Sequence, residues 1–307
     1  MKAAVYTKTE SDKVLEIIDV EKPTPTDDEV LIRVHAASVN PLDWRLKRRR
    51  PGVDVSGVIE VTGKKVTQFK PGDAVFGSGK GAFAEYATAS ERNLVPKPDH
   101  LTFEQAASVP IAALTALQGL RDKGQLQPGQ KVLINGAAGG VGTFSVQIAK
   151  SMGAHVTGIC STRNVEMVRL LGADRVIDYT NEDFAQTEER YDLVLDNVAN
   201  RRISALKRVL APTGKWVMVG APKETSAVLL GLLNLYLTKI GAFFSSQTFK
   251  FFIARIRTDD LMTICELIKT GKITPAIDKC YPLNEAANAI AYVQTCHARA
   301  KVIISMG

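Results

Sequence analysis

The chain has 307 residues, of which 45% are hydrophobic and 23% charged, a balance that excludes a disordered chain and suffices for two domains with separate cores. The formal net charge is +7, but outside the basic run at 45–50 the positive charges are scattered along the chain. No aromatic stacking platform accompanies the basic run. A solvated loop at 45–50 is therefore favoured over a nucleic-acid site. A peripheral contact of this run with an anionic membrane stays open.

Cysteine spacing and hydropathy exclude further classes. The four cysteines, at 160, 265, 280 and 296, form no C-x-x-C pair, which disfavours a disulfide framework and a zinc knuckle. The most apolar window, 227–244, contains Asn234 and Lys239, so we expect a buried helix followed by a strand and no membrane span. Nothing before the first strand has a signal-peptide pattern, which predicts a cytoplasmic protein, or an organelle-matrix protein if the chain is a processed form.

The first third of the chain has the pattern of an antiparallel β module. Short apolar segments at 1–6, 14–20, 30–36, 53–61, 66–69, 74–76 and 83–88 are separated by turn residues such as Pro71-Gly72-Asp73. Between Thr102 and Arg121 the apolar period becomes helical, with a break at Pro110. This change marks the predicted junction between two domains.

Beyond the junction, short apolar strands alternate with helical patterns, as in a parallel sheet wound on both faces. The predicted strands are 131–135, 155–160, 175–178, 193–196 and 215–219. In the tail we expect a helix capped at Thr258 and closed at Gly271, a helix over 284–295 and a strand over 301–305. The fold class is α/β: a discontinuous β-rich domain (1–112 and 272–307) and a doubly wound domain (113–271), with the cofactor in the cleft between them.

The segment Lys131 to Met152 reads as strand, glycine turn and helix. In the turn, Asn135-Gly-Ala-Ala-Gly-Gly-Val-Gly142, Gly139 allows a bend and close approach, and Gly142 allows close packing of helix on strand. Free N–H groups at the helix start attract an anion. Because a second βα unit follows at once, the turn predicts a dinucleotide pyrophosphate site.

The residues after the next strand indicate which dinucleotide binds. An NAD site usually has an acid there for the ribose 2′-hydroxyl, whereas this chain has Ser161-Thr162-Arg163. A hydroxyl and a guanidinium hold a 2′-phosphate through charge-assisted bonds, so NADPH is favoured over NADH. The competing interpretation is a solvated arginine in a surface loop.

Seven motifs, in order, resemble the zinc-free quinone oxidoreductase branch of the medium-chain dehydrogenase/reductase superfamily, the group around ζ-crystallin. They are Ala37-Ser-Val-Asn-Pro-Leu-Asp43, Phe69-Lys-Pro-Gly-Asp-Ala-Val-Phe76, Gly81-Ala-Phe-Ala-Glu-Tyr86, Ala113-Leu-Thr-Ala116, the turn at 135–142, Leu171-Gly-Ala-Asp174 and His297-Ala-Arg-Ala-Lys-Val302. The resemblance is strongest to chloroplast-envelope and mitochondrial members. It implies a GroES-like catalytic domain beside a Rossmann domain.

The resemblance also implies roles for individual residues. Asn40 and Thr115 are expected at the substrate and nicotinamide, although Asn40 in a simple turn cap, Thr115 bonded within its helix and Tyr179 in plain packing are the competing interpretations. The residues implied in cofactor binding are Ala138, Gly139, Gly140, Val141, Gly142, Ser161, Arg163, Tyr179, Asn197, Gly220, Ala221 and Arg299.

The same comparison predicts a metal-independent reductase. Where zinc-binding relatives place cysteine and histidine, this chain has Asn40-Pro-Leu-Asp43 and Gly52-Val-Asp54, and residues 1–112 contain no cysteine. The segment Arg48 to Gly52 is shorter than its counterpart in the family. We therefore expect hydride transfer from NADPH to a quinone or an α,β-unsaturated carbonyl compound.

Two matters stay open at this stage. The alternative function is a non-catalytic NADPH-binding interaction protein that contacts RNA or a membrane through Arg48, Arg49 and Arg50. The oligomeric state is either a monomer or a homodimer, the latter through an edge strand near 243–244.

Overall fold

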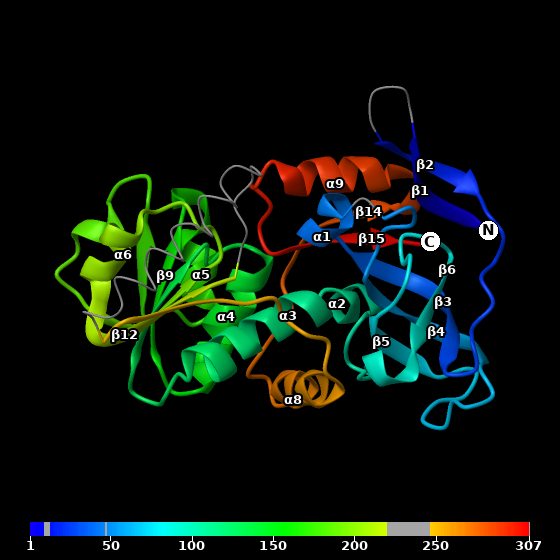
Figure 1. Cartoon of the computed structure of the whole chain (residues 1–307), viewed down its shortest axis with the longest axis horizontal. Coiled ribbons are helices and arrows are strands. Elements are labelled where there is room, and N and C mark those ends of the chain that lie inside the picture. Colours follow the sequence, from blue (N-terminus) through cyan, green and yellow to red (C-terminus); the bar gives the residue numbers. More distant parts are fainter. Residues whose placement is uncertain (9–12, 47, 220–245, 307) are drawn as a thin grey trace. The chain divides into compact units, whose positions relative to one another are not determined.

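The computed structural model describes residues 1–8, 13–46, 48–219 and 246–306 (Figure 1). The chain forms two compact units, Met1–Leu114 with Ile256–Gly307, and Thr115–Arg255. The first unit is discontinuous and includes helix α8 (Thr258–Lys269), a segment predicted to lie in the other domain. The apolar window at 227–244, the edge strand near 243–244, and the predicted site residues Gly220 and Ala221 lie outside the described residues.

The first unit is built on a mainly antiparallel sheet. Its order is β14-β15-β3-β4-β5-β7, β6 pairs with β3, and β1 pairs with β2 in a separate hairpin; only β14 and β15 run parallel within this unit as described. The strands are β1 (Lys2–Lys8), β2 (Lys13–Asp19), β3 (Glu29–Ser38), β4 (Asp54–Thr62), β5 (Ala74–Ser78), β6 (Tyr86–Ser90), β7 (Leu94–Pro96), β14 (Ile277–Pro282) and β15 (Lys301–Ser305).

Four further helices accompany this sheet, together with α8. They are α1 (Pro41–Arg45), α2 (Phe103–Ala107), α3 (Pro110–Leu117), which runs into the second unit, and α9 (Ala286–Gln294). Strand β3 is central: Val30, Ile32 and Val34 are buried with Val55 and Ile59 of β4 in one apolar cluster. The tail strand β15 pairs with β3, so the carboxyl-terminal segment completes the sheet begun at the amino terminus.

The second unit is a parallel sheet with helices between its strands. The order is β10-β9-β8-β11-β12-β13, and every pairing in it is parallel. The strands are β8 (Lys131–Asn135), β9 (His155–Cys160), β10 (Arg175–Asp178), β11 (Tyr191–Asp196), β12 (Leu210–Met218) and β13 (Thr248–Phe251); the helices are α4 (Gly140–Ser151), α5 (Val165–Leu170) and α6 (Ile203–Val209).

The strand order of this unit has a topological switch point. From β8 the chain moves outward through β9 to β10, and β11 then starts on the other side of β8 and leads to β12 and β13. Right-handed crossovers place the helices of the two halves on opposite faces of the sheet. Ligands of such sheets bind outside the carboxyl ends of the strands at the switch point, here between β8 and β11.

The predicted elements agree with the structure where apolar periodicity was strong. Predicted strands 131–135, 155–160, 175–178 and 301–305 match β8, β9, β10 and β15 to the residue. The predicted strand at 66–69 is wrong, because this segment is irregular. The predicted helix does begin at Thr258, but Arg257 holds its N-cap position, and the Thr258 hydroxyl donates to the carbonyl of Arg92. Among the described residues no helix has both the length and the apolarity to cross a membrane.

Candidate functional site

Four strand ends meet at one edge of the parallel sheet. Asp178 lies beside Cys160, Ile159 beside Asn135, and Asn135 beside Asp196 in the register of β10, β9, β8 and β11. The residues that follow these ends therefore share one edge of the second unit, which brings together the predicted turn at 136–142, Ser161, Tyr179 and Asn197. Six predicted cofactor residues, Ala138 to Gly142 and Asn197, flank the switch point itself.

The glycine turn is tight at two positions. Gly136 has φ +76, a left-handed conformation that suits glycine, and it was not singled out in the sequence. A Cβ added to Gly142 would lie 2.1 Å from the carbonyl oxygen of Gly136, so helix α4 can start here only without a side chain at 142. A Cβ on Gly139 would meet nothing nearer than 3.5 Å. The turn thus needs glycine at 136 and 142 for its shape, whereas a Cβ at 139 would make only ordinary van der Waals contact.

The start of α4 offers unpaired backbone donors. Gly139 is its extended N-cap, and the first helical bond runs from the Thr143 N–H to the Gly139 oxygen at 3.0 Å. The N–H groups of Gly140, Val141 and Gly142 precede that bond and have no carbonyl partner within their helix. Together with the positive end of the helix dipole, they fit a diphosphate.

Ser161, Arg163 and Tyr179 follow the paired ends of β9 and β10. The Tyr179 N–H donates to the Cys160 oxygen at 3.0 Å, which ties the two strand ends together. Arg163 is exposed, and the Tyr179 side chain is 53% exposed. Ser161 is half-buried, and its hydroxyl oxygen accepts from Asn164 Nδ2 at 3.1 Å. A guanidinium, a hydroxyl and an exposed ring at adjacent strand ends fit the phosphorylated adenosine half of NADPH.

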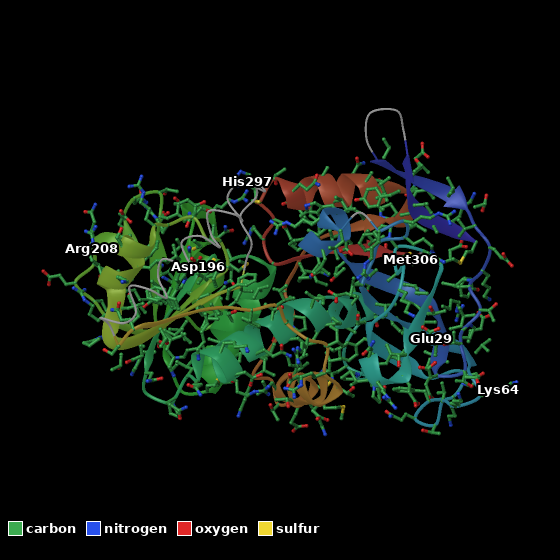
Figure 2. All side chains as sticks on the ribbon, viewed as in Figure 1. Glu29, Lys64, Asp196, Arg208, His297 and Met306 are labelled. Atoms are coloured by element: carbon green, nitrogen blue, oxygen red, sulfur yellow. The ribbon has the colours of Figure 1, made fainter. Side chains whose placement is uncertain are left out.

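The opposite side of the switch point is a polar turn held by Asp196, which is labelled in Figure 2. The Asp196 side chain is fully buried. Its Oδ1 accepts from Asn135 Nδ2 at 2.9 Å, and from the N–H groups of Val198 at 3.1 Å and Ala199 at 2.9 Å. Asn197 Nδ2 donates to the Asn135 oxygen at 3.0 Å, while its buried Oδ1 has no partner among the described residues. The predicted residue Asn197 is therefore fixed by strand β8.

A second polar group lies buried in the first unit, around Asn40. Asn40 Nδ2 donates to Asp54 Oδ2 at 2.8 Å and to the Ser38 carbonyl oxygen at 3.2 Å, and Asn40 Oδ1 accepts from Lys301 Nζ at 2.7 Å. Both amide hydrogens are thus engaged, and the residue is 3% exposed. We call Ser38, Asn40, Asp43, Asp54 and Lys301 the polar cluster.

The charges of the polar cluster are strongly perturbed. Burial raises the pKa of Asp43 to about 7, against the hydrogen bonds that Oδ2 and Oδ1 accept from the N–H groups of Asn40 at 2.7 Å and Gly52 at 3.1 Å. Burial also raises the pKa of Asp54 and lowers that of Lys301, and the attraction between these two opposes both shifts. The cluster thus contains one ammonium group, from Lys301, and two carboxyl groups, from Asp43 and Asp54.

The remaining predicted site residues belong to different elements. Thr115 is 7% exposed on α3. Arg299 lies between α9 and β15 in the first unit; its N–H donates to Asp278 Oδ2 at 2.8 Å, and its buried Nε has no partner among the described residues. In the basic run, Arg48 and Arg49 are exposed, as expected for a solvated loop. Arg50 is half-buried and donates from Nη2 to the Tyr86 oxygen at 3.2 Å.

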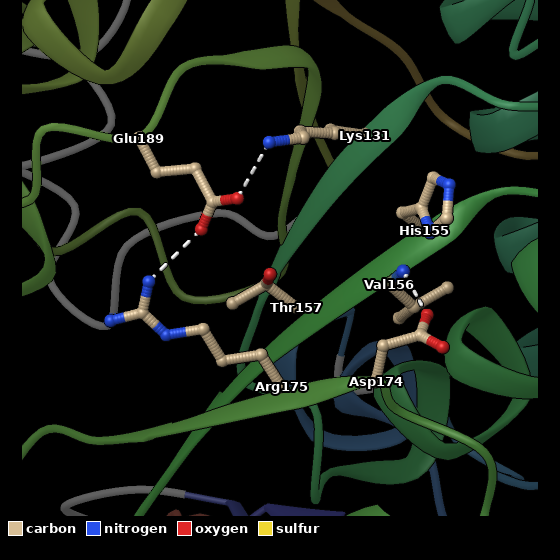
Figure 3. A pocket seen from close by; sticks show the side chains of 7 residues that line it. All are labelled: Lys131, His155, Val156, Thr157, Asp174, Arg175 and Glu189. Atoms are coloured by element: carbon tan, nitrogen blue, oxygen red, sulfur yellow. Dashed lines mark hydrogen bonds and ion pairs between the residues drawn. The ribbon is translucent and has the colours of Figure 1, made fainter.

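A pocket of about 200 Å³ lies at the other edge of the parallel sheet (Figure 3). Lys131 and His155 line it, and these are the first residues of β8 and β9, whereas the glycine turn follows the last residue of β8. Glu189 accepts from Lys131 Nζ at 2.8 Å and Arg175 Nη1 at 2.9 Å. The charges of this pocket neutralise one another, so we regard it as structural and separate from the cofactor turn.

Sequence reasoning missed two of these features. Lys301 begins an apolar strand, and an alternating pattern contains no sign that this lysine is only 3% exposed. Asp196 is the last residue of β11. It is buried beneath the following turn, where its Oδ1 accepts hydrogen bonds from the N–H groups of Val198 and Ala199. The spacing of Asn40, Asp43 and Asp54 was the available signal, because these polar residues lie on either side of the basic run at 45–50.

One unit has a dinucleotide turn at the switch point of its sheet, and the other has a buried polar cluster. These two features are typical of a nucleotide-dependent oxidoreductase. Residues 26–99 match the alcohol dehydrogenase GroES-like domain, and residues 171–304 match the zinc-binding dehydrogenase family. The chain belongs to the medium-chain dehydrogenase/reductase superfamily and is an NAD(P)H-dependent oxidoreductase, as its similarity to curated members shows.

Those members lie in two organelles. The chain is 35% identical to the mitochondrial NAD(P)H oxidoreductase RTN4IP1 of Bos taurus, with 91% of this chain and 82% of that protein covered. It is 32% identical to the chloroplast envelope quinone oxidoreductase homolog of Arabidopsis thaliana, with 94% and 93% covered.

Solved structures agree on the fold. The quinone oxidoreductase of Coxiella burnetii superposes with a TM-score of 0.88 at 29% identity, covering 100% of this chain and 99% of that one. A mycobacterial protein solved with NADPH superposes with a TM-score of 0.83 at 25% identity, covering 99% and 100%. The predicted α/β fold, with GroES-like and Rossmann parts, is confirmed.

The zinc implied by one family name does not fit the polar cluster. Catalytic zinc is held by thiolate, imidazole and carboxylate ligands, whereas the groups around Asp54 are a hydroxyl, an amide, a backbone N–H and an ammonium. The ammonium repels a second cation at the same place. Within the described ranges no three His, Cys, Asp or Glu side chains converge as metal ligands.

Proposed function

We propose that this chain reduces quinones or α,β-unsaturated carbonyl compounds, such as enones, 2-alkenals and oxidised-lipid ketones, with NADPH and without a metal. The observation that carries the proposal is the glycine turn at the switch point, which fits a dinucleotide, combined with relatives named for these acceptors. One such relative is the NADPH-dependent alkenal/one oxidoreductase of Arabidopsis thaliana, 31% identical with 99% of this chain and 79% of that protein covered.

The choice of NADPH over NADH rests on the ends of β9 and β10. Ser161 and Arg163 stand where an NAD site places its carboxylate, and both follow a strand end next to Tyr179. A guanidinium pairs with a phosphate dianion but gains little from a neutral hydroxyl. We assign Ser161, Arg163 and Tyr179 to the adenosine 2′-phosphate and ribose.

When bound, NADPH supplies a hydride for the electron-poor carbon of the acceptor. In this proposal, the amides at 138–142 bind the diphosphate, Asn197 with Gly220 and Ala221 flanks the nicotinamide side, and Thr115 and Arg299 complete the binding surface. Asn40 acts as a positioning residue, because its amide hydrogens are engaged by Ser38 and Asp54. Solvent provides the proton.

Location and assembly are proposals too. The related proteins are named as mitochondrial or chloroplastic, which supports an organelle matrix as much as the predicted cytoplasm. A monomer and a homodimer both agree with the fold.

Steady-state oxidation of NADPH tests the function directly. The panel contains 2-alkenals, vinyl ketones, oxidised-lipid ketones, and ortho- and para-quinones, each run with NADPH and with NADH. We expect turnover of at least one class, with NADPH preferred, in enzyme that elemental analysis shows to be free of stoichiometric zinc. Tight NADPH binding without turnover of any acceptor would refute the reductase function, and stoichiometric zinc would refute its metal independence.

A further inference from the structure

The ammonium of Lys301 is buried among oxygen atoms from two other segments of the first unit. Lys301 is the first residue of β15, and its side chain is 4% exposed. Its Nζ lies 2.7 Å from Asn40 Oδ1, 3.3 Å from the Val39 carbonyl oxygen and 3.6 Å from Asp54 Oδ2. The ammonium thus donates hydrogen bonds to Asn40 and Val39, and it forms an ion pair with Asp54.

The neighbouring carboxylate depends on this charge. Asp54 is fully buried, and its oxygens accept from Ser38 Oγ at 2.6 Å, Asn40 Nδ2 at 2.8 Å and the Ile111 N–H at 3.0 Å. These donors are neutral, and Lys301 is the cation in contact with it among the described residues. An isolated buried carboxylate is costly, so the ammonium compensates a charge that the hydrogen bonds alone leave uncovered.

The arrangement has the form of a small coordination sphere. A carboxylate, an amide oxygen and a backbone carbonyl, contributed by Asp54, Asn40 and Val39, converge on one positive centre. Oxygen sets of this kind are typical ligands of Mg²⁺, Ca²⁺ and Mn²⁺. Here the positive centre is a side chain of the protein itself.

We propose that Lys301 is a built-in cation, which takes the place of a metal ion among these oxygens and holds the polar cluster together by its charge. Asp54 and Asn40 are thereby fixed without any ligand from solution, and a divalent ion is excluded from the same position. The proposal explains why a member of a family named for zinc carries this cluster, and it does not depend on which acceptor is reduced.

Exchange of the lysine for a metal tests the proposal in the full-length protein. Lys301→Ala removes the ammonium and its stem, and leaves the three oxygens around a cavity. In chelator-treated buffer we expect the thermal midpoint to fall by roughly 10 °C, as for a buried carboxylate that loses its partner. Added Mn²⁺ is expected to raise the midpoint of this variant in a concentration-dependent manner and to bind at one equivalent by electron paramagnetic resonance, with no such response in the wild type.

Two matched variants separate charge from volume. Lys301→Met fills the space without a charge, so its midpoint should fall and stay insensitive to Mn²⁺. Lys301→Ala/Asp54→Asn keeps the cavity but lacks the carboxylate, so the Mn²⁺ response should be lost. Should Lys301→Ala fail to respond to Mn²⁺, the placement of the cation among ligand-type oxygens would be overturned.

A double variant keeps the test decisive if single variants fold poorly. Lys301→Met/Asp54→Asn removes both charges and retains the shape of the site. We expect it to be more stable than Lys301→Met alone, because the unpaired carboxylate is gone. A Lys301→Met protein as stable as the wild type, or a double variant no more stable than Lys301→Met, would show that the ammonium does not hold the cluster by its charge.

Discussion

Lys301 Nζ lies 2.7 Å from Asn40 Oδ1, although 261 positions separate the two residues in the chain. This bond joins β15 to the loop before α1 inside the first unit, and it uses an oxygen of the amide that the family resemblance places at the substrate. The two hydrogens of that amide are donated to Asp54 and Ser38. The polar cluster and the orientation of this predicted site residue therefore depend on the same hydrogen bonds.

Asn40→Ala is expected to destabilise the protein and reduce its activity together. The change removes one buried hydrogen-bond partner from Lys301 and one from Asp54, which we expect to lower the free energy of unfolding by about 2–4 kcal/mol. Urea unfolding followed by circular dichroism measures it. Asn181→Ala is the control, since Asn181 also donates to a carboxylate, Asp178 at 2.8 Å, but is exposed and should cost less than about 1 kcal/mol. Lost turnover with unchanged stability would instead place the amide on the substrate.

The stability of the protein should depend on pH through Asp43. Burial raises the pKa of Asp43 to about 7, and Asp54 adds repulsion that Lys301 opposes. Between the unfolded value of about 4 and this folded value, the native state binds more protons than the unfolded state, so the free energy of unfolding falls as pH rises through that window and levels off above it.

Asp43→Asn removes that titration. Relative to the variant, the free energy of unfolding of the wild type is expected to fall by roughly 2–3 kcal/mol between pH 5 and pH 8. The fall is about 1.4 kcal/mol for each pH unit up to pH 7, and it levels off above that pH. Urea titrations of both proteins at several pH values measure this difference. A constant difference across the range would show that Asp43 is ionised in the native state throughout.

The sequence predicted the second unit better than the first because its signals are local. A short apolar run, a glycine turn and a helix lie within 131–152, so strand β8 and the turn are correct without knowledge of the rest. The polar cluster, in contrast, joins residues 38–54 to Lys301, and such a contact follows from the pairing of β15 with β3. The apolar pattern predicted the strand at 301–305, but it does not indicate with which strand this segment pairs.

Two glycines of the turn should separate folding from cofactor binding. Gly142→Ala places its Cβ 2.1 Å from the Gly136 oxygen, so we expect a loss of about 2–3 kcal/mol in the free energy of unfolding together with weaker NADPH binding. Gly139→Ala has no such contact, and its φ of −82° suits alanine, so stability should stay within about 0.5 kcal/mol.

The affinity of Gly139→Ala for NADPH is then the informative quantity. A methyl group at this position of the turn hinders the close approach of a diphosphate, so fluorescence titration should show weaker binding despite an intact fold. Unchanged affinity would contradict the placement of the diphosphate on this turn.

Arg163 should discriminate between the two nicotinamide cofactors. Arg163→Ala is expected to weaken NADPH binding by roughly 1.5–3 kcal/mol, the range for a hydrogen bond to a charged group, and to leave NADH nearly unaffected. Calorimetric titration of both cofactors measures the difference. Arg169→Ala is the control: Arg169 is also exposed, lies on α5 and approaches Glu166 at 4.0 Å, and its loss should alter neither affinity. Because only NADPH carries the 2′-phosphate, equal losses for the two cofactors would contradict the assignment of Arg163 to that group.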